Sequence, residues 1–447
     1  MANQSEEATR ASPGGGGAAE VVLIYGRGSG NGGKNNHDDE EGRSRSWRRK
    51  TRMPNLRVLL CMRVVVVKEE EGGGFDVVES RPAAKENGGG VDEQQQQPSH
   101  LVITATRDLL WSGCISCSAD NWRYAAQQFV KKFPRDVVVH CCECNPPLST
   151  FDGVDVMGNR VAEEVLAVIK RYPSIRKISF IGHSLGGLVI RYAVAKLYGR
   201  VPVHESVKEI GVPQGDEAGK DASNEMLIDR VAGMEPVNFI TSATPHLGSR
   251  GPKQVPMLCG IYPLERLAVR SSWFLGRTGR HLFLTDGGKG RPPLLLQMVH
   301  DTDDLKFMSA LRSFKRQVAY ANSKFDNLVG WSTSSLRRRH ELPKQQLSKN
   351  KKYRYVVNVE PAKAVSPQQE VSTKRPVGGR KAIVLEEEML NSLASLPWER
   401  IDVRFSGSKQ CLFAHSTIQA SSLHVNRNCI NSDGADVIQH MIDNFVL

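Results

Sequence analysis

The residue best placed to do chemistry in this sequence is a serine between two glycines. The pentapeptide GHSLG (182–186) directly follows the apolar run KISFIG (177–182) and directly precedes the helix-like run LGGLVIRYAVAKLY (185–198). A strand, a sharp turn and a helix in this order form a nucleophile elbow, which lifts a serine hydroxyl clear of the sheet. The pentapeptide alone would also suit a structural serine. In this context, however, it predicts that Ser184 is a nucleophile.

A nucleophilic serine needs a histidine base, and the base needs an acid to orient it. In enzymes built around such an elbow, the acid and then the histidine follow the serine, each on a loop after a later strand. Asp326 follows the predicted strand QVAYAN (317–322), and His415 follows the predicted strand RIDVRF (400–405). We therefore predict a triad of Ser184, Asp326 and His415.

Other residues compete for the two supporting roles. Asp326 lies in the turn-like phrase NSKFDN, which would also suit a structural aspartate. Three further candidates for the acid come earlier in the chain: Asp286, Asp303 and Asp304. For the base, His424 stays open as the alternative to His415. His440 falls within the predicted last helix, where a histidine more often packs or faces solvent.

Two backbone N–H groups must bind the oxyanion that forms when the serine attacks a carbonyl. The N–H of Leu185, at the start of the predicted helix, is placed for this role. The second should come from the loop after the first strand of the domain, which here reads TRDLLWSGCISCSADNW. Its single glycine, Gly113, is the predicted second donor.

The elements that must position these residues begin near residue 100. Residues 1–99 contain GGGG, DDEE, KEEEGGG and QQQQ, which predict a disordered leader with at most a short strand near 56–67. Over 100–447, β-branched runs alternate with helical patterns, so we expect an α/β domain whose mainly parallel sheet has helices on both faces. The segment 245–310 lies between two strands and would form a cap or lid, or a surface excursion.

The expected strands are 101–106, 136–141, 177–182, 237–243, 317–322, and either 353–360 or 400–405 as the last. The expected helices are 121–133, 159–171, 185–198 and 434–447. Asn159 is placed to cap the start of the second helix.

The charge distribution and the number of cysteines restrict which partners and cofactors are plausible. The net charge is +12, and basic residues gather in 43–63 and 336–354. Such runs are usually solvated, so we expect no nucleic acid, and contact of 336–354 with an anionic membrane is a weaker expectation. The chain has nine cysteines, an odd number that suits a reducing compartment. A zinc site at Cys114, Cys117, Cys141, Cys142 and Cys144 is disfavoured, because the second group lacks a C-x-x-C pair.

The sequence also bears on location. The start MANQSEEATRASPGGGG lacks a basic region followed by an apolar core, which argues against a secretory signal. The longest apolar run, LRVLLCMRVVVV (56–67), is short and is broken by Arg63. We expect an intracellular protein that is cytoplasmic or peripherally membrane-bound, without a transmembrane helix.

Several long stretches, in order, resemble the putative serine esterase family of lipase-like α/β-hydrolases, and within it the plant-type members. They include FDGVDVMGNRVAEEV (151–165), ISFIGHSLGGLVIRYAVAKLYG (178–199), ITSATPHLGSRG (240–251) and NSDGADVIQHMIDNF (431–445). The resemblance covers most of 100–447. It implies an α/β-hydrolase fold and hydrolysis of lipid-like acyl esters, with no metal or organic cofactor. Ser184 matches the family nucleophile directly, whereas Asp326 and His415 match it by placement.

One departure from the family bears on function. Family members usually show a His-Gly or Asn-Gly loop ahead of the segment that here reads SADNW, whereas this chain has ITATRDLLWSGCISCSADNW. The leading hypothesis is a serine esterase or lipase. The departure motivates a rival, a catalytically impaired scaffold that binds a lipid or protein. A third reading is acyl transfer to an acceptor other than water with the same triad.

Overall fold

In the computed structural model, the described residues are 77–78, 97–107, 120–200, 229–258, 261–288, 290–343, 352–363, 381–420, 423–425, 428–430 and 432–447. Several sequence-based expectations therefore lie outside the described residues: Gly113, Cys114, Cys117, the basic run 43–63 and the strand near 56–67. The expected leader 1–99 lies outside them too, apart from 77–78 and 97–99.

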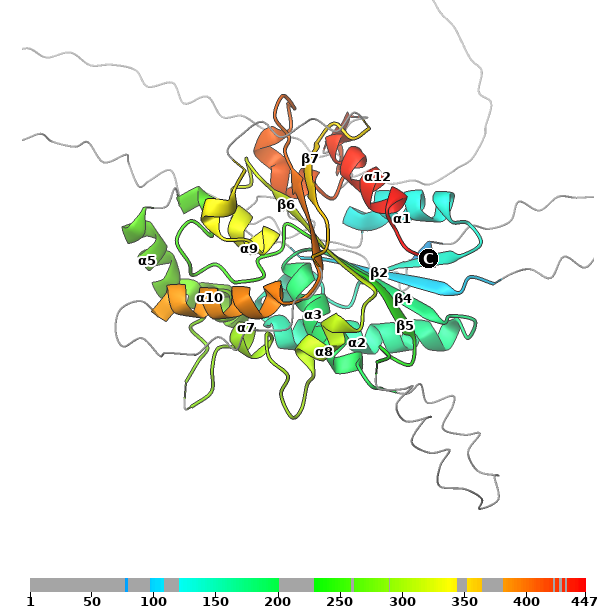
Figure 1. Cartoon of the computed structure of the whole chain (residues 1–447), viewed down its shortest axis with the longest axis horizontal. Coiled ribbons are helices and arrows are strands. Elements are labelled where there is room, and N and C mark those ends of the chain that lie inside the picture. The colour runs from blue at the N-terminus through cyan, green and yellow to red at the C-terminus, as the bar shows by residue number, and fades with distance from the viewer. Residues whose placement is uncertain are drawn as a thin grey trace, which may run out of the picture. The chain divides into compact units, whose positions relative to one another are not determined.

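An eight-stranded sheet carries the fold, in the spatial order β1-β3-β2-β4-β5-β6-β8-β7 (Figure 1). Its strands are β1 (Val77–Val78), β2 (His100–Arg107), β3 (Val137–Cys141), β4 (Lys177–Ser184), β5 (Glu235–Ser242), β6 (Arg316–Asn322), β7 (Val356–Glu360) and β8 (Trp398–Val403). The six central strands are parallel, and β1 and β7 are antiparallel edges. Both alternatives for the last strand are present: 400–405 overlaps the parallel strand β8, and 353–360 contains the edge strand β7.

Helices cover both faces of this sheet. One face packs against α2 (Val154–Arg171), α3 (Leu185–Leu197), α8 (Phe307–Arg312) and α10 (Lys381–Ala394), which share one apolar core. The other packs against α1 (Asp120–Lys132), α11 (Ala414–Thr417) and α12 (Ala435–Asp443), which share a second. Because the central strands are buried on both faces, their sequences are nearly continuous runs of apolar residues.

Helix α2 begins earlier than the sequence predicted. Its N-cap is Gly153, whose φ of 105° favours glycine, so Asn159 lies inside the helix and the predicted cap is wrong. The buried positions Val154 and Met157 extend the apolar stripe of the helix about two turns upstream of Val161.

Between β5 and β6, the helices formed by the described residues are all short. They are η4 (Pro256–Leu258), α5 (Tyr262–Arg270), η5 (Ser272–Leu275), α6 (Gly276–Leu282), α7 (Leu294–Gln297) and α8. The remaining short elements are η3 (Pro147–Phe151), α9 (Trp331–Ser335), η6 (Arg339–Glu341), η7 (Cys411–Phe413), β9 (Leu423–Val425), β10 (Asn428–Ile430) and η8 (Ser432–Gly434). Within the described part of the chain, no helix is long and apolar enough to cross a membrane.

The junction of β4 and α3 completes the fold assignment. A mainly parallel sheet, helices on both faces and a sharp strand-to-helix turn at its centre together constitute an α/β-hydrolase fold.

Candidate active site

Ser184 is the last residue of β4 and stands in a strained turn. Its φ is 54° and its ψ is −131°, a conformation that costs free energy and is typical of functional sites. The flanking glycines permit the turn. A Cβ on Gly186 would lie 2.5 Å from the carbonyl oxygen of Ala105, and one on Gly182 would lie 2.6 Å from the Cα of Gly187. The local geometry is that of a nucleophile elbow.

The end of β4, the loop after β6 and the short helix α11 bring Ser184, Asp326 and His415 together at the carboxyl edge of the sheet. The Nε2 of His415 lies 2.9 Å from the Oγ of Ser184. The Nδ1 of His415 lies 3.0 Å from Oδ2 and 3.2 Å from Oδ1 of Asp326. All three residues are buried. Because a carboxylate only accepts, Nδ1 carries the proton, which leaves Nε2 free to accept the serine hydroxyl.

Asp326 is held as a carboxylate. Its Oδ1 accepts the N–H groups of Leu328 and Val329, at 3.0 and 2.9 Å, and its Oδ2 accepts the Asn322 amide at 2.9 Å. Burial by itself raises the pKa of this carboxyl. The positive charge that His415 can carry, with these hydrogen bonds, outweighs burial and lowers the pKa below its usual value. The group is therefore suited to stabilise an imidazolium.

Two further residues position the triad, and sequence reasoning missed both. The Nε2 of His183 lies 2.7 Å from the carbonyl oxygen of His415, which can only accept, so Nε2 donates. Its Nδ1 then accepts the Thr106 hydroxyl at 3.1 Å. The amide of Asn322 donates to Asp326 and also to the carbonyl oxygen of Ala414, at 3.1 Å. Two positions in the sequence could have drawn attention to them. His183 directly precedes the nucleophile, and Asn322 ends the strand that precedes Asp326.

Two of the five competing residues, Asp286 and His440, form hydrogen bonds outside the triad. Asp286 accepts the backbone N–H of Leu294, and His440 contacts the Tyr320 hydroxyl through Nδ1 at 2.8 Å. Asp303 and Asp304 are exposed in the turn before α8. His424 is part of β9, and its side chain is outside the described residues.

For the oxyanion, the structure describes one of the two predicted donors. Leu185 follows Ser184 directly and is the first residue of α3. Its N–H therefore makes no hydrogen bond within the helix. The chain leaves β2 at Arg107, whose backbone is in register with Ser184 on the neighbouring strand. The segment with Gly113 therefore starts next to the serine, and Gly113 stays a prediction.

One cluster among the described residues has the side chains of a metal site. Ligand atoms of His140, Cys142 and Glu164 lie within 4.8 Å of one another. Glu164 already accepts His140 at 2.9 Å and the N–H groups of Glu143 and Cys144. Burial, and then the nearby Glu164, raise the pKa of the Cys142 thiol well above its usual value. A metal needs the thiolate, so the cluster fits a hydrogen-bonded pair of His140 and Glu164 better.

Three of the four arginines of the basic segment 336–354 are paired with acids. Arg337 is buried and donates to Asp402 at 2.6 Å, with Glu360 at 3.4 Å. Arg338 pairs with Glu387, and Arg339 pairs with Glu386. These three arginines therefore do not form an unpaired basic surface, and membrane contact at 336–354 stays a prediction. Residues 344–351 lie outside the described part.

Comparisons with known proteins identify the family of the chain. Residues 95–336 match the family model described as "Putative serine esterase (DUF676)", a range that includes Ser184 and Asp326. "Putative lipase ROG1" of Saccharomyces cerevisiae is 30% identical over 213 residues, which are 48% of this chain and 25% of that protein. "Putative lipase C4A8.10" of Schizosaccharomyces pombe is 27% identical over 247 residues, 53% of this chain and 26% of that protein. The chain thus spans about a quarter of the length of these relatives.

Solved structures show distant similarity. The mature lipase BlEst2 of Bacillus licheniformis has a TM-score of 0.29 at 12% identity, covering 57% of this chain and 75% of that one. A butyrate-bound esterase, Est2 of Thermogutta terrifontis, has a TM-score of 0.29 at 13% identity, covering 58% and 70%. The family assignment rests on the family model, which matches more than half of the 447 residues. The chain belongs to the putative serine esterase (DUF676) family.

Proposed function

We propose that the protein is a serine hydrolase that cleaves carboxylic esters, lipid acyl esters in particular, through Ser184, His415 and Asp326. The observation that carries the proposal is the continuous hydrogen-bonded path from Asp326 through His415 to Ser184 at a strained elbow. Hydrogen bonds of this order and length are what nucleophilic catalysis by serine requires.

In the proposed reaction, the Oγ of Ser184 attacks the ester carbonyl carbon while the Nε2 of His415 takes the hydroxyl proton. Asp326 stabilises the imidazolium that results. The N–H of Leu185 and a second donor, proposed at Gly113, bind the oxyanion. The intermediate collapses, and the departing alcohol takes the proton from His415. Water then attacks the acyl-enzyme by the same route and releases the acid.

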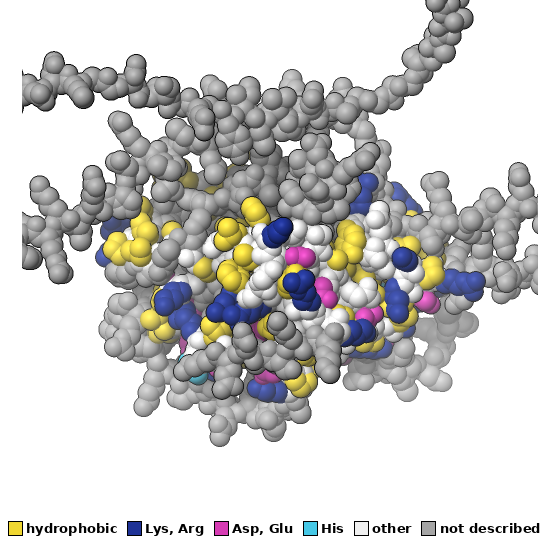
Figure 2. Space-filling view, turned by 90° about the horizontal axis from the view of Figure 1, so that it is seen from above, with side chains coloured by type: hydrophobic (Ala, Val, Ile, Leu, Met, Phe, Trp, Pro, Cys, Tyr) yellow, Lys and Arg dark blue, Asp and Glu magenta, His cyan; other side chains and the backbone are white. Residues whose placement is uncertain are grey.

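Apolar side chains around the triad support a lipid-like substrate. Phe325 and Phe413 stand next to the acid and near the base, with 38% and 58% of their surface exposed, and Leu412 is 70% exposed. Exposed apolar groups gathered at one place are typical of surfaces that bind lipid or protein. Figure 2 shows apolar and basic side chains side by side on one face of the described structure.

The segment 245–310 is proposed to act as a cap. Its helix α5 leaves Leu264 and Leu267 exposed, and the neighbouring rings of Trp273 and Phe274 stack at 3.7 Å while remaining mostly exposed. A helix with an exposed apolar stripe suits contact with an acyl chain or a lipid surface. Peripheral membrane contact is proposed at this segment.

We include in this proposal four more specific properties that were expected from the sequence. They are plant-type membership, a role in lipid metabolism, a cytoplasmic or peripheral membrane location, and action without a metal or organic cofactor or a nucleic acid. The departure in the segment that contains Gly113 favours one rival, a catalytically impaired scaffold. Product analysis with added alcohol acceptors separates hydrolysis from acyl transfer.

Activity-based labelling tests the proposal. A fluorophosphonate should label the purified chain, and medium-chain p-nitrophenyl esters should be hydrolysed. Both activities should be lost in Ser184→Ala and kept in Ser313→Ala, whose hydroxyl only donates to the carbonyl of Ala310. Well-folded protein that neither reacts with the probe nor cleaves any ester would make the scaffold the better account.

A further inference from the structure

The first turn of α2 is capped by side chains from the segment 245–310. The N-cap residue, Gly153, has no side chain that could accept the free N–H groups of this helix end. Two residues of α6 accept them instead. The N–H of Gly153 donates to the Thr278 hydroxyl at 3.0 Å, and the N–H of Val154 donates to Nδ1 of His281 at 3.2 Å. Both acceptors are buried, so two buried hydrogen bonds join α6 to α2.

The bond to His281 depends on the protonation state of the ring. Because a backbone N–H can only donate, Nδ1 of His281 is unprotonated when it accepts the N–H of Val154. A protonated ring would bring two donors face to face, and it would place a positive charge at the N-terminus of α2, where the helix dipole disfavours it. The Thr278 hydroxyl does not titrate in this way. Acid therefore breaks one of the two bonds.

Charged groups from α2, from α6 and from the chain after α6 face this ring. The Oδ2 of Asp286 lies 3.9 Å from Nε2 of His281, and Asp155 of α2 forms an ion pair with Arg277 of α6. Burial has the largest effect and lowers the pKa of His281. Asp286 and then Asp155 raise it, whereas Arg277 and Arg280 lower it, and the pKa ends below its usual value of 6.5. The ring is therefore neutral at pH 7, and its bond to α2 is intact.

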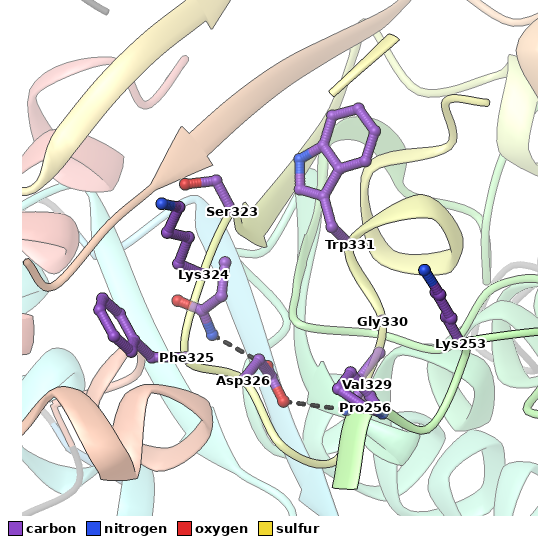
Figure 3. Close-up of a pocket in the computed structure, with 10 residues that line it drawn as sticks. Lys253, Pro256, Ser323, Lys324, Phe325, Asp326, Val329, Gly330 and Trp331 are labelled. Atoms are coloured by element: carbon purple, nitrogen blue, oxygen red, sulfur yellow. Dashed lines mark hydrogen bonds between the residues drawn. The ribbon is translucent and has the colours of Figure 1, made fainter. Parts of the chain in front are cut away.

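Near its start, the segment 245–310 is attached to the loop of the acid through the backbone. Figure 3 shows Lys253 beside Gly330, in the loop that also carries Asp326. The N–H of Gly330 donates to the carbonyl of Gln254 at 2.9 Å, and a Cβ on Gly330 would lie 2.6 Å from the carbonyl oxygen of Lys253. A backbone hydrogen bond does not titrate. Acid therefore acts on the attachment at α6 and not on this one.

Helix α2, to which α6 is attached, packs directly against the helix of the nucleophile. A Cβ on Gly158 of α2 would lie 2.6 Å from the ring of Tyr192 of α3, so the two helices touch there. A small cavity between them is lined by Gly186, two residues after Ser184. Ser184 is only 4% exposed, so movement of a neighbouring segment changes how readily an ester reaches it.

We propose that His281 is a pH-sensitive switch that holds the segment 245–310 on α2 when its ring is neutral and releases α6 when its ring is protonated. Release moves α6 away from α2 and widens the approach to Ser184. The switch regulates the proposed hydrolase and rests on that proposed function for its effect on substrates. Each pH unit below 6.5 favours the released state by up to about tenfold, until the ring in the attached state is protonated too.

Hydrogen exchange measures the release without any substrate. In the wild type, exchange of the backbone amides of α6, divided by their intrinsic exchange rates, should become about tenfold faster from pH 7 to pH 5. In His281→Asn, the side-chain oxygen takes the place of Nδ1, accepts the N–H of Val154 and does not titrate. Its corrected exchange should change by less than about twofold over the same range.

A second histidine of the same segment provides the matched control. His300 is exposed, and its Nε2 lies 3.4 Å from Glu388. His300→Gln should keep the pH dependence of the wild type. A wild type whose corrected exchange does not change with pH would overturn the switch. So would a His281→Asn variant that keeps the full dependence, or a His300→Gln variant that loses it.

Hydrolysis tests the effect on substrates and separates the switch from the function. The ratio of kcat/KM for p-nitrophenyl octanoate to that for the acetate cancels the titration of His415. From pH 7.5 to pH 5.5 this ratio should rise about fivefold in the wild type and stay within about twofold in His281→Asn. A constant ratio in the wild type, or an equal rise in both proteins, would overturn control of access by His281. A protein that cleaves neither ester but shows the pH-dependent exchange would refute the hydrolase function and retain the switch.

Discussion

Ser184 adopts a backbone conformation that is rare for serine, and its neighbours make that conformation accessible. The sequence showed why residues 182 and 186 are glycines, because a sharp turn leaves no room for a side chain at either position. In the structure, a Cβ at either glycine would clash with neighbouring backbone. His183 and Asn322 could not be predicted in the same way. Each acts on a backbone carbonyl, that of His415 or Ala414, and a carbonyl leaves no mark on the residue types of a sequence.

Removing the donor on His183 should slow catalysis without weakening substrate binding. His183→Phe loses the hydrogen bond to the His415 carbonyl, so the base loop shifts, and kcat should fall about 100-fold with KM unchanged. His183→Gln keeps an N–H at this place and should recover most of the rate. Steady-state kinetics on a soluble ester give both constants. If the Gln variant were as slow as the Phe variant, His183 would not act through this donor.

At the level of elements, the strand-to-helix junction was predictable and the helix boundaries were less so. β4 and α3 follow from a β-branched run and an amphipathic run that meet at GHSLG. The start of α2 was missed because it depends on the positive φ of Gly153, which the sequence does not reveal. The edge position of β7 depends on pairing with β8, which comes later in the chain.

A single methyl group should distort the elbow. Gly186→Ala places a Cβ against the backbone of Ala105 and Thr106, which cannot move without disrupting β2. We expect loss of fluorophosphonate labelling and a lower melting temperature. Gly288→Ala is the control, because its added Cβ meets nothing within 4 Å and its φ is not in the left-handed region. Normal labelling of Gly186→Ala would show that the turn is wider than described.

On the scale of the whole molecule, ion pairs and hydrogen bonds join segments that are distant in sequence. Arg337 reaches Asp402, and Ser179 joins His100 to Asn238. The sequence shows a basic run at 336–354 but not its partners, because Asp402 and Glu360 come from strands whose pairing depends on the folded sheet. The sequence therefore could not show that Arg337 is paired inside the folded molecule.

The buried arginine should matter far more for stability than its exposed neighbour. Arg337→Gln leaves Asp402 buried without its charged partner, which typically costs about 3–5 kcal/mol. Arg338→Gln removes an exposed pair and should cost about 0–1 kcal/mol. Urea unfolding followed by circular dichroism measures both. Equal losses would mean that Arg337 and Asp402 are not buried together.

Acid should destabilise the fold partly through His100. The Oγ of Ser179 accepts two donors from Asn238, so its hydrogen goes to the Nε2 of His100 at 2.8 Å, and that nitrogen must stay unprotonated. Burial, and then Lys177, lower the pKa of His100 to about 3. The unfolded chain takes up this proton near the ordinary histidine pKa of 6.5, and the folded chain takes it up near a pKa of about 3. Stability therefore decreases as the pH is lowered through that range.

Replacing His100 should remove part of this dependence. In His100→Gln, the side-chain oxygen can still accept the Ser179 hydroxyl but cannot take up a proton. The free energy of unfolding should therefore decline less steeply between pH 6.5 and 4 than in the wild type. Urea titrations at three pH values measure the slope, and an unchanged slope would show that His100 is not buried in its neutral form.

The rate of covalent labelling at Ser184, located by mass spectrometry, tests the central claim most directly. The hydrogen-bonded path through His415 predicts that a fluorophosphonate adduct forms on Ser184 in the wild type and in His424→Ala. The adduct should be lost, or form at least about 10³-fold more slowly, in His415→Ala. Normal labelling of His415→Ala, or its loss in a folded His424→Ala, would contradict the account.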